Sequence, residues 1–414
     1  MTRHSFAGAL AGVLLWASAG TGAAQTVTQR GFVDVGLALF PQETTVDRTQ
    51  ATLDVLVREE LFARPTPWLQ LAGGVDLRGN THDQVARAWR LDVSDRGEQR
   101  PMLGLRRLTA TVSKGPLTVD VGKQFIRWGK ADIVTPTDHF APRDFLTVID
   151  SPFLAVPAAR AVVQAGSHTV DVVWQPRFTP SRLPLIDQRW TVLPAGVDGV
   201  RLLPSAQALP TRDQVGVRWG HTGDGYEVSV SAFDGINHLP NVAAVPAANV
   251  RELIVLRDYP RLRSIGADGA WPTRWFTVKG EAALFRAHDS DADDYVLYVL
   301  QLERQTGEWL LLGGYAGEVV TTRRAAASFA PDRGLTRAFV ARASYTVDSN
   351  RSLAFESAVR QNGHGVYVKG EFSQARGAHW RATVAGVALA GRSDDFLGQY
   401  RRNSHLTLSL RYSF

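Results

Sequence analysis

The chain has 414 residues, with 46 Lys and Arg against 40 Asp and Glu, a net charge of +6 and no cysteine. The lack of cysteine excludes a disulfide-stapled domain. Beyond residue 25 no run of about 18 apolar residues exists, which excludes a transmembrane helix. A mean hydropathy of −0.12 fits a soluble protein and equally a membrane barrel, whose strands alternate polar and apolar residues.

The first 25 residues have the pattern of a secretory signal peptide. Arg3 and His4 precede the apolar run 6–20, and small residues follow at 21–25. A basic start, an apolar stretch and a small-residue cleavage site are its three parts. We predict a signal peptide over 1–24 and a mature chain over 25–414. The alternative is a membrane anchor, for which the helix would be short and Gly-rich.

Most of the mature chain consists of period-2 segments of about ten residues, which indicate half-buried strands. The stretch 250–258 is read as a loop element or as an extension of the next strand. Eighteen strands are predicted, over residues 31–40, 51–62, 67–79, 101–113, 117–128, 159–166, 168–175, 213–221, 225–234, 261–271, 275–286, 294–304, 308–320, 335–347, 351–361, 365–373, 378–390 and 403–414.

The connections between these strands alternate between short and long. Tight turns such as 114–116 and 305–307 alternate with long segments such as 129–158 and 176–212. A soluble sandwich or propeller does not have this asymmetry, whereas an outer-membrane barrel has tight periplasmic turns and longer outer loops. We therefore predict an all-β fold: a transmembrane antiparallel up-and-down β-barrel of about 18 strands. It would be integral to the bacterial outer membrane, with both termini periplasmic and long outer loops folding over or into the lumen.

The last predicted strand carries apolar residues at every second position, from Leu406 to Phe414. Unpaired backbone groups in lipid cost several kcal/mol each, so a barrel has no free edge. We therefore expect this strand to pair with the first, with Tyr412 and Phe414 in the interfacial aromatic girdle. A terminal aromatic strand also resembles the signal that the barrel-assembly machinery recognises.

Alternation also assigns side chains to the inner face of each strand. Past Phe125 the pattern slips, so Arg127 reaches the lumen only after a bulge. The inner set has more cations than acids, which favours anionic solutes; the alternative is salt ladders that hold the wall. The predicted pore-lining residues are Arg58, Asp76, Arg78, Gln124, Arg127, Arg218, Lys279, Glu281, Arg342, Glu356, Arg360, Lys369, Glu371, Arg381 and Arg411.

Two of the long loops have features of function. Residues 129–158 contain four prolines and several phenylalanines, so we expect this loop to fold into the lumen as a constriction. The net positive loop 176–212 would plug the pore, grip lipopolysaccharide or dock a partner. The alternative for both is packing for stability alone. The predicted constriction residues are Lys130, Asp138, His139, Arg143 and Asp144.

The acidic stretch 288–295 spaces Asp289, Asp291 and Asp293 like a calcium loop, but it lacks the glycine and distal glutamate of an EF-hand. It would bind a divalent cation loosely or be a solvated acidic tip; no other cofactor is expected. No GxSxG, HExxH or P-loop motif is present, and the histidines lack ligand spacing. We therefore expect no enzymatic activity.

Several phrases, among them "VGKQFIRWGKAD", "TPTDHFAPRDF" and "DDFLGQYRRNSHLTLSLRYSF", together resemble an uncharacterised family of Gram-negative outer-membrane β-barrels. That family is distantly similar to alginate-export porins, which have eighteen strands and an Arg-rich lumen. The resemblance covers residues 30–414 and implies a porin-like channel. Under alginate-type export the solute-facing cations would be Arg58, Arg78, Arg218, Arg342, Arg360 and Arg411.

The sequence therefore favours a passive channel or export conduit for anionic or polar solutes, polysaccharide included. One alternative is a transporter of lipids or hydrophobic compounds. Another is a barrel that transports nothing and docks a periplasmic or surface partner. The expected partners are outer-membrane lipid, lipopolysaccharide, the barrel-assembly machinery and the solute, with no nucleic acid. The oligomeric state stays open.

Overall fold

The computed structural model describes residues 26–192, 200–205, 208–249, 252–288, 292–323 and 330–414. The predicted signal peptide lies outside these residues and stays a prediction. Within them no helix has both the length and the apolar character needed to cross a membrane. Only two short 3-10 helices are present there, η1 (Pro331–Arg333) and η2 (Gly398–Asn403). Almost all regular structure in the described part is β-strand.

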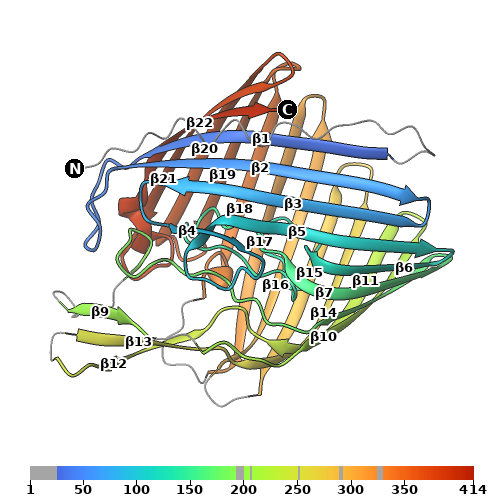
Figure 1. Ribbon diagram of the computed structural model, residues 1–414, viewed down its shortest axis with the longest axis horizontal. Helices are drawn as coiled ribbons and strands as arrows, with labels where there is room; N and C mark the ends of the chain where they lie inside the picture. The colour runs from blue at the N-terminus through green and yellow to red at the C-terminus, as the bar shows by residue number, and fades with distance from the viewer. Residues whose placement is uncertain (1–25, 193–199, 206–207, 250–251, 289–291, 324–329) are drawn as a thin grey trace.

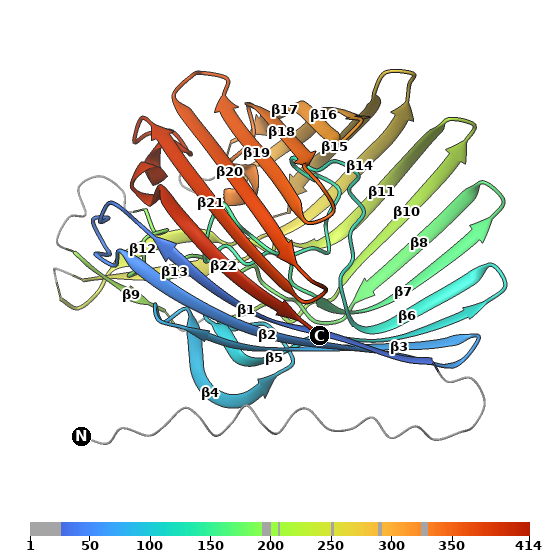
Figure 2. The same cartoon turned by 90° about the horizontal axis from the view of Figure 1, so that it is seen from above.

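Eighteen antiparallel strands form a closed barrel (Figures 1 and 2), and each corresponds to one predicted strand. The predicted fold class is therefore confirmed. The wall consists of β1 (Thr26–Leu39), β2 (Ala51–Thr66), β3 (Leu69–Asn80), β5 (Arg100–Lys114), β6 (Leu117–Gln124), β7 (Val156–Ala165), β8 (His168–Gln175), β10 (Gln214–Gly223), β11 (Tyr226–Ile236), β14 (Arg261–Pro272), β15 (Thr277–Ala287), β16 (Asp294–Thr306), β17 (Trp309–Thr322), β18 (Ala338–Thr346), β19 (Arg351–Arg360), β20 (Gly365–Arg376), β21 (Trp380–Gly391) and β22 (His405–Ser413).

The barrel closes between its first and last strands. β1 and β22 pair antiparallel from Phe32 opposite Ser413 to Leu39 opposite Leu406. Beyond this ladder, the Gly31 N–H donates to the Phe414 carbonyl at 2.9 Å, and the Phe414 N–H donates back at 3.0 Å. The predicted pairing of the last strand with the first is confirmed.

Four further strands lie outside the cylinder. β4 (Val85–Asp92) runs parallel to the start of β5 and arches away from the wall (Figure 2). β9 (Arg201–Pro204), β12 (Asn241–Pro246) and β13 (Glu252–Asp258) form a separate small sheet. Of the stretch 250–258, residues 252–258 form a strand of this small sheet between two wall strands, and they do not extend the next wall strand.

The outer face of the barrel is apolar. Leu406, Leu408 and Leu410 are exposed, although each would be buried in a water-soluble core. Trp side chains gather near the short-turn end of the wall, as in the aromatic girdles of outer-membrane barrels, at Trp68, Trp219, Trp271, Trp275, Trp309 and Trp380. A closed wall with an apolar exterior indicates an integral outer-membrane protein. Thr26, the first described residue, and Phe414 both lie at the short-turn end of the wall.

The wall is incomplete at β6. This strand was predicted to reach residue 128, but it ends at Gln124, where the chain turns inward. The upper part of β5 thereby loses its partner. Two substitutes replace it: β4 pairs with β5 at Leu103 and Gly104, and the Lys123 ammonium donates to the Leu105 carbonyl at 2.6 Å. Backbone groups that the missing strand would have paired are thus partly satisfied.

Gly122 permits the turn at this point. Its φ is +125°, and a Cβ there would collide with the Leu108 carbonyl oxygen. A left-handed backbone of this kind favours glycine strongly. The strand therefore leaves the wall where glycine allows the backbone to bend against β5.

We predict that Gly122→Ala destabilises the folded barrel by about 1–3 kcal/mol, the usual cost of a strained non-glycine backbone. Urea unfolding in detergent, followed by heat-modifiable mobility on gels, measures the change. Gly36→Ala is the matched control, because a Cβ at Gly36 meets nothing within 4 Å. Equal stability of the two variants would contradict this account of Gly122.

Candidate functional site

The segment between β6 and β7, residues 125–155, runs inside the barrel (Figure 2) and is called here the inner loop. Its Ile126, Trp128 and Phe140 are buried in one cluster with Val173 and Phe285 of the wall. The Trp128 indole N–H donates to Asp171 of β8 at 2.9 Å. The apolar residues that suggested an inward fold thus attach the loop to one side of the lumen.

Glu281 of β15 holds the backbone of the loop to the same side of the lumen. The buried carboxylate accepts hydrogen bonds from the N–H groups of Lys130 at 3.0 Å, Ala131 at 3.1 Å and Thr137 at 2.8 Å, and from the Thr137 hydroxyl at 2.9 Å. A carboxylate is the natural acceptor for several converging N–H groups. Glu281 therefore acts as a seat for the inner loop.

Asp138 organises the loop from within. Its carboxylate accepts from the backbone N–H groups of Trp128 at 2.7 Å and Gly129 at 2.8 Å, and from the Arg127 side chain at 3.1 Å. Arg127 therefore belongs to the inner loop and is not on a strand after a bulge, as the sequence had suggested. The cause is the early end of β6.

A buried ion network ties three outer segments together. Asp144 accepts two hydrogen bonds from Arg100 of β5, at 2.8 and 3.1 Å, and one from Arg182 at 3.2 Å. Arg182 also contacts Asp95 at 2.7 Å, and Lys123 contacts the same carboxylate at 2.5 Å. Although burial opposes ionisation, the two guanidinium groups lower the pKa of Asp144 to about 2.

His139 of the inner loop is buried, and its ring stacks on Phe233 of β11 at a centroid distance of 5.0 Å. Burial lowers the pKa of His139 to about 4, so this side chain is neutral at pH 7. His238 approaches the His139 carbonyl at 2.9 Å and the Thr179 carbonyl at 2.7 Å. These contacts make His139 part of the loop packing.

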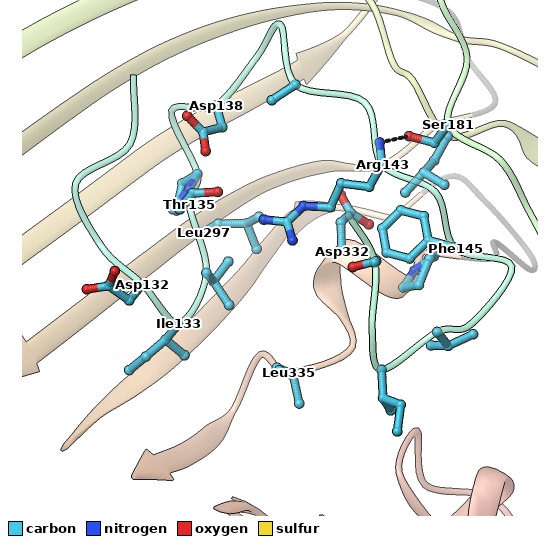
Figure 3. A pocket seen from close by; sticks show the side chains of 18 of the residues that line it. Asp132, Ile133, Thr135, Asp138, Arg143, Phe145, Ser181, Leu297, Asp332 and Leu335 are labelled. Carbon is cyan, nitrogen blue, oxygen red and sulfur yellow. Dashed lines mark hydrogen bonds between the residues drawn. The ribbon is translucent and has the colours of Figure 1, made fainter. Parts of the chain in front are cut away.

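A cavity of about 430 Å³ lies beside the inner loop (Figure 3). One side is apolar, with Phe233, Phe285 and Leu297 among its lining residues. The Arg143 side chain extends into the cavity (Figure 3), and its guanidinium lies 4.0 Å from the Phe153 ring centre. Within the described residues no carboxylate lies within salt-bridge distance of Arg143. No salt bridge there neutralises its charge.

A series of arginines follows the inner face across β21, β22, β1, β2, β3 and β5. Asp76 accepts from both Arg58 at 2.7 Å and Arg78 at 2.8 Å. We call this group the arginine arc; it consists of Arg30, Arg58, Arg78, Arg106, Arg107, Arg381 and Arg411.

The arc has more cations than its contacting carboxylates can neutralise. Glu60 lies 2.9 Å from Arg30, 3.4 Å from Arg107 and 3.7 Å from Arg106. Arg411 pairs with Asp34 at 2.7 Å. Arg381, directly opposite Arg411, donates to the Ser373 hydroxyl at 3.1 Å and has no carboxylate within salt-bridge distance among the described residues. Six of the seven arginines therefore share three carboxylates, and the seventh contacts none.

Sequence reasoning missed Arg106 and Arg107. The pairing of β5 with β3 shifts by one residue between Leu105 and Arg107, so a bulge brings both arginines close to Glu60. A signal was available, because the outward apolar series steps by three residues from Leu105 to Leu108 where alternation requires two.

The other predicted pore residues are mostly paired. Gln124 donates to the Ala158 carbonyl at 2.9 Å, and Arg360 is held by Asp395 at 3.2 Å. The tetrapeptide "VKGE" occurs twice, at 278–281 and 368–371. The lysine of the first copy contacts acids outside its own tetrapeptide, and the lysine of the second contacts the glutamate of its own copy. The remaining contacts are Arg218 with Asp268 at 2.9 Å, Lys279 with Glu303 at 2.8 Å and Asp132 at 3.2 Å, Arg342 with Glu356 at 2.7 Å, and Lys369 with Glu371 at 3.0 Å.

The predicted cation loop is only partly described. Asp289 and Asp291 lie outside the described residues, and Asp293 lies 3.9 Å from the Arg333 guanidinium. Where the chain is described, no group of three or more His, Asp or Glu side chains is placed to hold a metal ion. A divalent cation at this loop stays a prediction.

We predict that Asp144→Asn loosens the inner loop at neutral pH, because Arg100 and Arg182 lose their shared anion. In the wild type the lowered pKa of Asp144 stabilises the network above about pH 4, and this stabilisation is lost as the pH falls toward 2. Limited proteolysis between residues 129 and 155, across this pH range, measures the effect. A variant as protected as wild type at pH 7 would contradict it.

We also predict that Glu281→Ala increases single-channel conductance and open-channel noise, because three backbone N–H groups lose their acceptor and the loop leaves its seat. Planar-bilayer recording measures both quantities. Glu303→Ala is the control, since Glu303 lies on the neighbouring strand and contacts Lys279 without contacting the loop. The same change in both variants would point to lumen charge as the cause.

No protein-family model matches the chain, and neither does any curated protein sequence. Solved structures do match. OccAB4 of Acinetobacter baumannii and a BenF-like porin from Pseudomonas fluorescens Pf-5 each give a TM-score of 0.56 at 8% identity, covering 94% of this chain and 98% of theirs. Pseudomonas aeruginosa OpdK, solved with vanillate, gives 0.51 at 10% identity, covering 93% and 98%. These matches support the outer-membrane barrel part of the resemblance and do not test alginate export. The chain therefore has the fold of outer-membrane porins.

Proposed function

We propose that the protein is a passive outer-membrane channel for small anionic solutes, which diffuse through the lumen without a chemical step. The observation that carries this proposal is the arginine arc, in which seven arginines have only three carboxylates among them as described partners. Anions gain electrostatic stabilisation along such a surface and cations are repelled. The pore-lining role of Arg58, Arg78, Arg381 and Arg411 is part of the proposal.

The cavity beside the inner loop has the opposite balance of charge from the arc. Asp132, Asp138 and Asp150 of the loop line it, against Arg143. A solute at this level would meet arginines on one side and carboxylates on the other. Such a transverse field orients a polar solute and favours passage in one alignment.

Elsewhere in the lumen, cations and anions are matched nearly one to one. Arg218, Arg342 and Lys369 each have a carboxylate partner within about 3 Å. These pairs fit the ladders that hold the wall together. The proposal therefore assigns charge selectivity to the arc and to Arg143, and a structural role to the paired residues.

The inner loop also limits solute size, which favours small molecules over the polysaccharide suggested by the alginate-export resemblance. The apolar side of the cavity, with Phe233, Phe285 and Leu297, would accommodate solutes that carry an apolar part beside their charge. The same apolar side of the cavity favours a second candidate function, the passage of hydrophobic compounds.

We predict that Arg106→Gln combined with Arg107→Gln lowers the anion-over-cation permeability ratio by about two- to fivefold, because each charge near an ion path in water is worth about 1 kcal/mol at 4 Å. Reversal potentials in a KCl gradient give the ratio. Arg342→Gln combined with Glu356→Gln is the control, since it removes a matched pair without changing net charge.

Two results would overturn the proposal. One is the absence of conductance both in the wild-type barrel and in the Glu281→Ala variant, in which the inner loop is released. The other is a permeability ratio that is equal in the arc variant, the control and the wild type.

A further inference from the structure

The outward face of β20 and β21 contains a hollow of about 450 Å³. We call it the outer groove; its lining includes Leu353, Phe355, Gly370, Phe372, Val384 and Gly386. Phe355, Phe372 and Val384 are exposed on the lipid side of the wall. The outer groove therefore opens toward the membrane and has no connection with the lumen cavity.

Two glycines form the floor of the outer groove. Gly370 and Gly386 lie directly opposite each other in the β20–β21 ladder. A Cβ built on either residue meets nothing within 4 Å, so the space above them is open. Phe355 occupies the next position in the same row, opposite Gly370 on β19. The depression is thus bounded by larger side chains and bare at its centre.

A second hollow of about 420 Å³ continues the outer groove toward the periplasmic end, lined by Gln374, Arg376, Trp380, Ala382 and Leu410. Arg376 is the last residue of β20 and Trp380 the first of β21, across a short turn. The Arg376 side chain is exposed and forms no salt bridge within the described residues. The exposed Arg376 guanidinium therefore lies near the Trp380 indole, at the end of the wall where lipid headgroups are expected.

We infer that the outer groove binds one glycerophospholipid from the periplasmic leaflet, with an acyl chain over Gly370 and Gly386 and its phosphate at Arg376. Lipid tails are as apolar as the groove, so the hydrophobic effect does not select an occupant. Selection comes from the contacts that a tail gains in a depression and from the attraction of Arg376 for phosphate.

The other copy of the "VKGE" tetrapeptide shows that a glycine on the outer face does not create a groove by itself. Gly280 also faces outward, with nothing within 4 Å of a built Cβ. Its partner in register is Gly269, and the Trp271 ring covers Gly269 so closely that a Cβ there would lie 2.7 Å from it. At Gly370 and Gly386 no side chain takes that place.

The test uses the full-length protein, purified in mild detergent and titrated with phosphatidylglycerol, with native mass spectrometry as the readout. The wild type should retain one phospholipid. Gly370→Phe and Gly386→Phe fill the groove and should lower the retained fraction about tenfold, while the matched control Gly280→Phe should retain the lipid. Heat-modifiable mobility shows which variants fold.

Arg376→Gln separates charge from shape. It should weaken retention of phosphatidylglycerol about fivefold, as expected for one basic residue at a lipid surface, and leave retention of neutral diacylglycerol unchanged. Equal retention by wild type and both folded groove variants would overturn the inference. So would a wild type that purifies as an oligomer and becomes monomeric with Gly370→Phe, since a second copy would then occupy the groove.

Discussion

The hydrocarbon core of a membrane contains no water to satisfy a peptide group, and this constraint determines the wall of the protein. Eighteen strands pair in a ring, and Gly31 and Phe414 exchange hydrogen bonds across the closure. The one place where a strand leaves the ring early shows the same constraint. There β4 and the Lys123 ammonium take over part of the pairing that β6 does not supply.

Three carboxylates in the interior hold the inner loop in different ways. Glu281 and Asp138 bind backbone N–H groups and fix the course of the inner loop, and Asp144 joins that loop to Arg100 and Arg182. All three acids are engaged in holding structure, and in the described part of the chain none of them forms a salt bridge with an arginine of the arc.

Alternation and loop length were enough to predict the number of strands and their order, because both are local properties of the sequence. The end of β6 was misjudged, since it depends on a glycine conformation and on contacts with residues far away in the chain. Arg106 and Arg107 were missed because a bulge breaks the alternation that was used to assign faces. The partners of Lys279 could not be predicted from the sequence either, because Asp132 and Glu303 approach this lysine only in the closed barrel.

Glu281 binds the inner loop mainly through main-chain N–H groups, which every residue except proline supplies. This attachment therefore tolerates substitution of the side chains at Lys130 and Ala131. Over evolutionary time such a barrel can change which molecules it admits while keeping one scaffold. Solute selectivity and the architecture of the barrel can then change independently.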